Sequence, residues 1–209
     1  MTRRLTATLA ALTISACLIG CVNGARFPAY YTLHVPPTLD VPIVGGTRSS
    51  IAVREFRSPT YLRQGAIVYR TSPEQVGFYQ YHRWAVDPRE FLTNAIIDRL
   101  RATGRFAEVR AYDGRSDVDF VLNGRLEKLE EVDYEGGVRV EVALSAEITD
   151  SRAGKTVWAN AASETVEVNK RTVPAVVAEM SQAMDGAIQK LMASLTVSTT
   201  SSLNPSLQK

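Results

Sequence analysis

Hydrophobic and polar positions along this chain of 209 residues follow a two-residue period in some stretches and a helical period in others. The clearest alternation runs from Val138 to Thr149, where every even-numbered position is apolar. This pattern predicts a strand with one buried and one solvated face. Residues 120–129 and 155–168 have strand composition and are joined to it by turn-forming sequences. We therefore expect an antiparallel meander of three strands.

Two stretches carry helical periodicity. The first begins at Asp87 and Pro88, which suit the cap and the first turn of a helix, and ends at Gly104. The second begins near Thr172 and carries a broad apolar stripe, made of Val176, Val177, Met180, Ala183, Met184, Ala187, Ile188, Leu191 and Leu195. We interpret the stripe as core. Because Met180, Met184 and Met192 are adaptable, a groove for lipid stays open as an alternative.

A hairpin is predicted between these parts, from strands at 67–70 and 76–84 separated by a short turn containing Pro73. Strict alternation places Tyr79, Tyr81 and Arg83 on one face of the second strand. The opposite face then carries Val76, Phe78, Gln80, His82 and Trp84. Packing within the sheet explains these aromatic residues, but Tyr, Trp and Arg also anchor protein interfaces. The candidate partner-binding residues are Tyr79, Tyr81, His82, Arg83 and Trp84.

Together with short strands near 30–33, 51–56 and 106–109, these elements predict an α+β fold. We expect one domain over residues 30–196, with a mixed, largely antiparallel sheet and two main helices packed on it. Residues 197–209 are rich in Ser and Thr and are interpreted as a disordered tail.

Residues 1–20 have the pattern of a secretory signal peptide, with Arg3 and Arg4 ahead of an uncharged apolar run. The run is shorter than the ~20 residues that span a bilayer. It ends in Leu-Ile-Gly followed by Cys21, which resembles a bacterial lipobox with Cys21 as the acylated residue, carrying acyl chains such as palmitate. Residues 21–29 then form a tether. Cleavage before Cys17 and an ordinary secreted protein stay open as alternatives.

Removing this signal lowers the Lys and Arg count from 24 to 22, equal to the 22 Asp and Glu residues. A domain of zero net charge without a basic run lacks the electrostatic pattern of nucleic-acid binding. The only cysteines are Cys17 and Cys21, so the folded domain contains neither a disulfide nor a thiolate metal site.

Catalytic motifs are missing from the sequence. The two histidines, His34 and His82, belong to no nucleophile motif, and we expect neither a metal nor a cofactor. The carboxylate pairs Asp117/Asp119 and Glu130/Glu131 are interpreted as solvated positions. We therefore expect a protein that is not an enzyme. The alternative is a lipid-anchored periplasmic hydrolase that uses His82 with an unrecognised nucleophile.

The lipobox, the residues Tyr31-x-Leu33, the segments 67–70 and 76–85, and the helix that ends at Gly104-x-Phe106 resemble the ABC-type transport auxiliary lipoprotein family, including its paraquat-inducible group. The resemblance implies a periplasmic accessory subunit that docks onto an MCE-domain protein or its ABC transporter in intermembrane lipid transport. It implies a mixed sheet flanked by helices and no catalytic residue. Phospholipid contact and a homo-oligomer are compatible with this role. Val22 replaces the Asp that resembles an inner-membrane retention signal, so we expect an outer-membrane anchor facing the periplasm.

Overall fold

The computed structural model describes residues 26–36, 48–114, 117–134 and 136–202, with side chains up to residue 195. The predicted signal peptide, Cys21, the first part of the tether and residues 203–209 of the predicted tail lie outside these ranges. In chain order the elements are β1 (Ala29–Tyr31), β2 (Ser50–Val53), the 3₁₀ helix η1 (Thr60–Arg63), β3 (Ala66–Arg70), β4 (Val76–Trp84), α2 (Pro88–Thr103), β5 (Glu108–Ala111), β6 (Phe120–Tyr134), β7 (Gly137–Asp150), β8 (Lys155–Glu167) and α3 (Val173–Ser202).

The three longest strands form the predicted antiparallel meander. β6 pairs with β7 along its whole length, from Phe120 opposite Asp150 to Tyr134 opposite Gly137, and β7 pairs with β8. The other edge of β6 is shared by two parallel neighbours, β2 at its start and β3 near its end. β5 extends the sheet beyond β2, and β4 and β1 extend it beyond β3. The result is a mixed sheet of eight strands that does not close, in a single α+β domain, as the sequence predicts.

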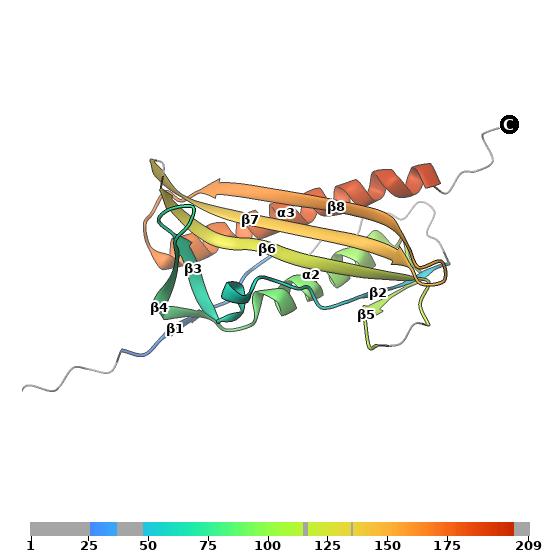
Figure 1. Cartoon of the computed structure of the whole chain (residues 1–209), viewed down its shortest axis with the longest axis horizontal. Helices are drawn as coiled ribbons and strands as arrows, with labels where there is room; N and C mark the ends of the chain where they lie inside the picture. Colours follow the sequence, from blue (N-terminus) through green and yellow to red (C-terminus); the bar gives the residue numbers. More distant parts are fainter. Residues whose placement is uncertain (1–25, 37–47, 115–116, 135, 203–209) are drawn as a thin grey trace, which may run out of the picture.

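Both helices cover the same face of this sheet, and the opposite face of β6, β7 and β8 is open (Figure 1). The even-numbered residues of β7 from Val138 to Ile148 are all buried against the helix layer. All nine residues of the apolar stripe on α3 are buried, and Met180 and Met184 have no exposed surface. The stripe is therefore core, as predicted, and is not a groove for lipid.

The boundaries of α2 follow the predicted local chemistry. Asp87 Oδ1 accepts a hydrogen bond from the backbone N–H of Arg89 at 2.9 Å, which satisfies a free donor of the first turn. Gly104 ends the helix with φ at 56°, a left-handed conformation that favours glycine. α3 continues to Ser202, past residue 196 where the domain was expected to end.

Among the described residues, no helix combines the length and the apolar character needed to cross a bilayer.

Candidate partner-binding site

An irregularity in β4 decides where the predicted partner-binding residues point. The pairing steps from Ala66 opposite Arg83 to Val68 opposite Phe78, so β4 advances five residues where β3 advances two. The three extra residues form a bulge, and an odd number of extra residues reverses the alternation of side chains. The predicted faces are therefore wrong in part. Tyr79 lies with His82 and Trp84, not on the opposite face.

Tyr79, His82 and Trp84 belong to the inner side of this part of the sheet. The ring of Tyr79 contacts those of Tyr69 and His82, with centroids 5.0 and 5.7 Å apart. The Tyr69 ring also packs against Gly77. A Cβ atom at this position would lie only 2.3 Å from the ring, so the contact requires glycine. Trp84 is 7% exposed. These three β4 residues therefore hold β4 against the core.

Two hydrogen bonds complete this inner network. The Tyr79 hydroxyl donates to Glu131 Oε2 at 2.7 Å, and the Tyr31 hydroxyl shares a 2.9 Å hydrogen bond with His82 Nδ1. Burial is the main reason that the pKa of Glu131 is raised, and the bond from Tyr79 only partly offsets it. Burial, followed by the bond to Glu131, likewise raises the pKa of Tyr79. Compared with water, the fold therefore disfavours the ionised form of both groups.

Tyr81 and Arg83 point to the other side and are exposed. Arg83 lies opposite Tyr30 of β1 in the strand register, so these two side chains share a face. Tyr81 is two residues before Arg83 in β4 and therefore lies on the same face. Phe78 also points away from the inner side, because it precedes Tyr79 in the strand. Tyr30 is 63% exposed, and Phe78 and Tyr81 are each 36% exposed. We call Tyr30, Phe78, Tyr81 and Arg83 the β1–β4 patch.

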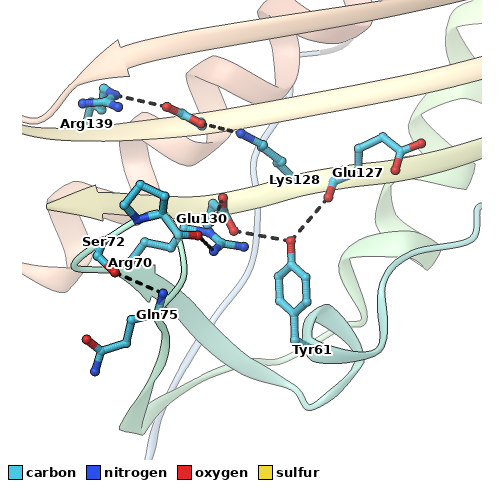
Figure 2. Close-up of polar contacts among 10 residues, drawn as sticks. Tyr61, Arg70, Ser72, Gln75, Glu127, Lys128, Glu130 and Arg139 are labelled. Atoms are coloured by element: carbon cyan, nitrogen blue, oxygen red, sulfur yellow. Dashed lines mark hydrogen bonds and ion pairs between the residues drawn. The ribbon is translucent and has the colours of Figure 1, made fainter. Parts of the chain in front are cut away.

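Sequence reasoning missed a second polar cluster, on the open face at the end of β6. Glu130 is only 1% exposed there, and its carboxylate accepts from Arg70 Nε at 2.7 Å and from the Tyr61 hydroxyl at 3.4 Å (Figure 2). The prediction of solvated positions for Glu130 and Glu131 is wrong, because β6 continues to Tyr134 and does not end near Leu129. Adjacent strand residues face opposite sides, so the two carboxylates are buried on opposite faces of the sheet.

The open face also carries a wide groove of about 750 Å³. Its lining is polar and of mixed charge, with Arg54, Arg57 and Arg125 beside Glu55 and Glu147. No histidine lines it. Over the described ranges, no group of three or more His, Cys, Asp and Glu side chains is placed to hold a metal ion.

The geometry around His82 bears on the hydrolase alternative. A nucleophile would have to lie within hydrogen-bonding reach of its general base. In the part of the chain that the structure describes, the side chain that hydrogen-bonds His82 is Tyr31. His34 is exposed, and only its backbone N–H takes part in a described bond, to Ser181 Oγ at 3.1 Å.

Two solved structures share this fold. A crystal structure of a Xanthomonas campestris protein is similar with a TM-score of 0.69 at 16% identity, covering 83% of this chain and 98% of that one. The crystal structure of a second, uncharacterized protein is similar with a TM-score of 0.61 at 18% identity, covering 84% of this chain and 99% of that one. At these identities the likeness concerns the fold alone. No curated protein matches the chain.

The sequence itself matches the model of one protein family over residues 31–191, which spans the sheet and both helices. That family is described as the ABC-type transport auxiliary lipoprotein component, an accessory family and not an enzyme family. The chain belongs to the family of ABC-type transport auxiliary lipoproteins.

Proposed function

We propose that this protein is a lipid-anchored periplasmic subunit that docks onto an intermembrane lipid transport complex through the β1–β4 patch. Family membership supports the accessory role. The single observation that supports the docking surface is the exposed set of three aromatic rings with Arg83 at one end of the sheet. Aromatic and arginine side chains are those that most often anchor protein interfaces. The proposed partner is an MCE-domain protein or the associated ABC transporter.

The anchor in this proposal is an acylated Cys21 in the outer membrane, with the domain facing the periplasm. Ala29, the first residue of β1, follows Cys21 by eight residues, which reach at most about 30 Å when extended. The β1–β4 patch would therefore stay close to the membrane surface. A partner bound there would be held at the point where a lipid enters or leaves the membrane.

We also propose that the protein acts by binding and not by catalysis. Of the predicted candidates, Tyr79, His82 and Trp84 have structural contacts that account for them. Tyr81 and Arg83 are the two with surface to offer a partner. The proposed docking surface therefore keeps two of the five predicted residues and adds Tyr30 and Phe78.

Crosslinking in cells tests this proposal. A photoreactive amino acid in place of Tyr81 should capture an MCE-domain protein or a transporter subunit, because the side chain lies within the proposed interface. Arg152, in the turn between β7 and β8, is the control position, since its side chain is 88% exposed but far from β4 in the sheet. Equal capture from both positions, or capture only of proteins unrelated to transport, would contradict the docking surface.

A further inference from the structure

The groove on the open face of the sheet contains two arginine side chains without a counter-ion. Arg54 and Arg57 follow β2 in the chain, and Arg125 of β6 lies opposite Arg57. Arg125 is paired with Glu127, at 2.7 Å between Nε and Oε2. Within the described residues, the guanidinium groups of Arg54 and Arg57 take part in no ion pair. The groove therefore holds two positive charges that no described neighbour compensates.

A bulge directs both arginines to the same side. The buried Val53 of β2 lies opposite Leu122 of β6. A later bridge joins Arg57 to Arg125, so the chain after β2 advances four residues where β6 advances three. Strict alternation from Val53 would turn Arg57 toward the helices, and the extra residue turns it to the open face, where Arg54 also points. Bulges that redirect a side chain in this way are frequent beside functional sites.

The core beneath the groove fixes this bulge. The fully buried Phe56 ring packs under Gly124, where a Cβ atom would lie only 2.2 Å from the ring. The Phe56 N–H donates to Thr93 Oγ1 of α2 at 3.0 Å and not to the sheet. As a result Arg57 is held directly opposite Arg125, and these like charges repel each other. An anion bound between the arginines would offset this repulsion.

Arg54 contributes a buried donor without a partner. The carbon of its guanidinium group lies 4.4 Å from the centre of the Tyr112 ring, so the side chain is held over the aromatic face. In the described part of the chain, its buried Nε atom has no hydrogen-bond partner. Buried donors of this kind are rare in folded proteins, and a bound anion is one of the groups that satisfy them.

We propose that this groove binds a phosphate group, held between Arg54 and Arg57. The paired donors of a guanidinium group match phosphate oxygens, and a phosphate has enough oxygens to accept from two guanidinium groups at once. A carboxylate has two oxygens and is matched by one. The groove of about 750 Å³ is larger than a single ion requires, and small residues line part of it, namely Gly124, Ser145 and Ala159. A free phosphate ion and the phosphodiester of a lipid headgroup share this chemistry.

The acidic residues of the groove leave the charge of the two arginines in place. Glu55 is paired with Arg89 of α2, at 3.5 Å. Glu147 lies on β7, which is separated from β2 by β6 and is therefore about 10 Å from it. The groove lies toward the β2 end of the sheet, whereas β1 and β4 lie at the other end (Figure 1). The phosphate site is therefore independent of the proposed docking surface.

Titration with inorganic phosphate tests the site. The full chain is purified in a non-ionic detergent, and the Nε–H resonances of its arginines are followed by NMR at constant ionic strength. We expect the resonances of Arg54 and Arg57 to shift with phosphate and not with chloride. Arg57→Gln should lower the phosphate affinity about tenfold, because charge-assisted hydrogen bonds are lost. Glu147→Gln should raise it about twofold, because a repelling charge is removed.

Arg101→Gln is the matched control. Arg101 is 56% exposed and lies on α2, which covers the other face of the sheet. This variant should leave the phosphate affinity unchanged, and the melting temperature of each variant reports whether the domain is folded. Equal losses from Arg57→Gln and Arg101→Gln would reveal an effect of net charge alone and overturn the site. Acetate binding as tightly as phosphate would overturn the choice of phosphate.

Glycerophosphoglycerol, a phosphodiester without acyl chains, distinguishes the two sources of the group. Tighter binding of this compound than of inorganic phosphate would assign the groove to a lipid headgroup, since the glycerol hydroxyls add contacts in the groove. Tighter binding of inorganic phosphate would assign it to the free ion. Binding of neither compound would overturn the proposal. That result would leave the docking surface untouched, because crosslinking from Tyr81 tests it separately.

Discussion

The fold changes the ionisation of the Glu131 carboxyl group. The residue is 7% exposed, and within the described residues its carboxylate accepts a hydrogen bond from the Tyr79 hydroxyl. Burial raises its pKa above the ordinary value near 4.5, and Asp133 adds to this effect while Tyr79 and Arg171 oppose it. An acid whose pKa is higher in the folded state stabilises the fold at low pH. That contribution is lost as the pH rises through the raised pKa.

Glu131→Gln should therefore remove a pH-dependent loss of stability. The neutral amide can still accept the Tyr79 hydrogen bond. We expect the variant and the wild type to have similar free energies of unfolding at pH 4, and the variant to be at least as stable at pH 8. Urea unfolding across this range measures the difference.

Glu141→Gln is the control of opposite sign. Burial opposes its ionisation, but hydrogen bonds from Lys128 and Arg139 lower the pKa of Glu141 overall. This contribution to stability is present above the ordinary pKa and lost as the pH falls through the lowered one. The control should lose stability at neutral pH. A Glu131→Gln protein that behaved in the same way would show that the buried carboxylate stabilises the fold in its charged form.

At the scale of elements, the ion pair between Arg70 on β3 and Glu130 on β6 joins the hairpin to the meander on the open face. The side chains are 17% and 1% exposed, so both are largely removed from water. Figure 2 shows the guanidinium and the Tyr61 hydroxyl converging on this carboxylate. On the neighbouring strand β7, the carboxylate of Glu141 accepts from both Lys128 and Arg139. Removing one partner of a buried pair leaves an uncompensated charge.

Arg70→Met should destabilise the domain by about 3 kcal/mol, because it leaves the buried Glu130 carboxylate without a cation. Lys128 lies on β6, the strand of Glu130, and forms an ion pair with Glu141 in which the lysine is 49% exposed. Lys128→Met should therefore cost about 1 kcal/mol or less. Chemical denaturation of the two variants measures both values. Equal losses would mean that burial of Glu130 adds nothing to the strength of its pair with Arg70.

At the scale of the whole molecule, the proposed anchor places the domain relative to the membrane. Burial of each acyl CH₂ group contributes about 0.8 kcal/mol, so several acyl chains give lasting attachment where one does not. Cys21→Ala should therefore stop acylation and release the chain from membranes after a carbonate wash. Cys17→Ala, the alternative lipobox cysteine, should leave the chain in the membrane pellet. The reverse pattern would move the anchor to Cys17.

The patterns that are local in the chain determined much of the fold. In β7, the alternation of apolar and polar residues determines which side chains face the core. In α2 and α3, the caps and the apolar stripe depend on residues only a few positions apart in the chain. Burial of one face is then sufficient to predict which residues form the core. The α+β class and the antiparallel meander follow from these elements and the short turns between them.

Tertiary pairing decided what the candidate site contains. The bulge in β4 exists only in the register with β3, and it moves Tyr79 to the side of His82 and Trp84. The burial of Glu130 and Glu131 likewise depends on strands far away in the sequence that supply Arg70 and Tyr79. Periodicity along one segment carries no information about such partners. The sequence by itself therefore determined the elements and their buried faces, whereas the contacts between distant strands decided that Tyr81 and Arg83 are exposed and that two carboxylates are enclosed.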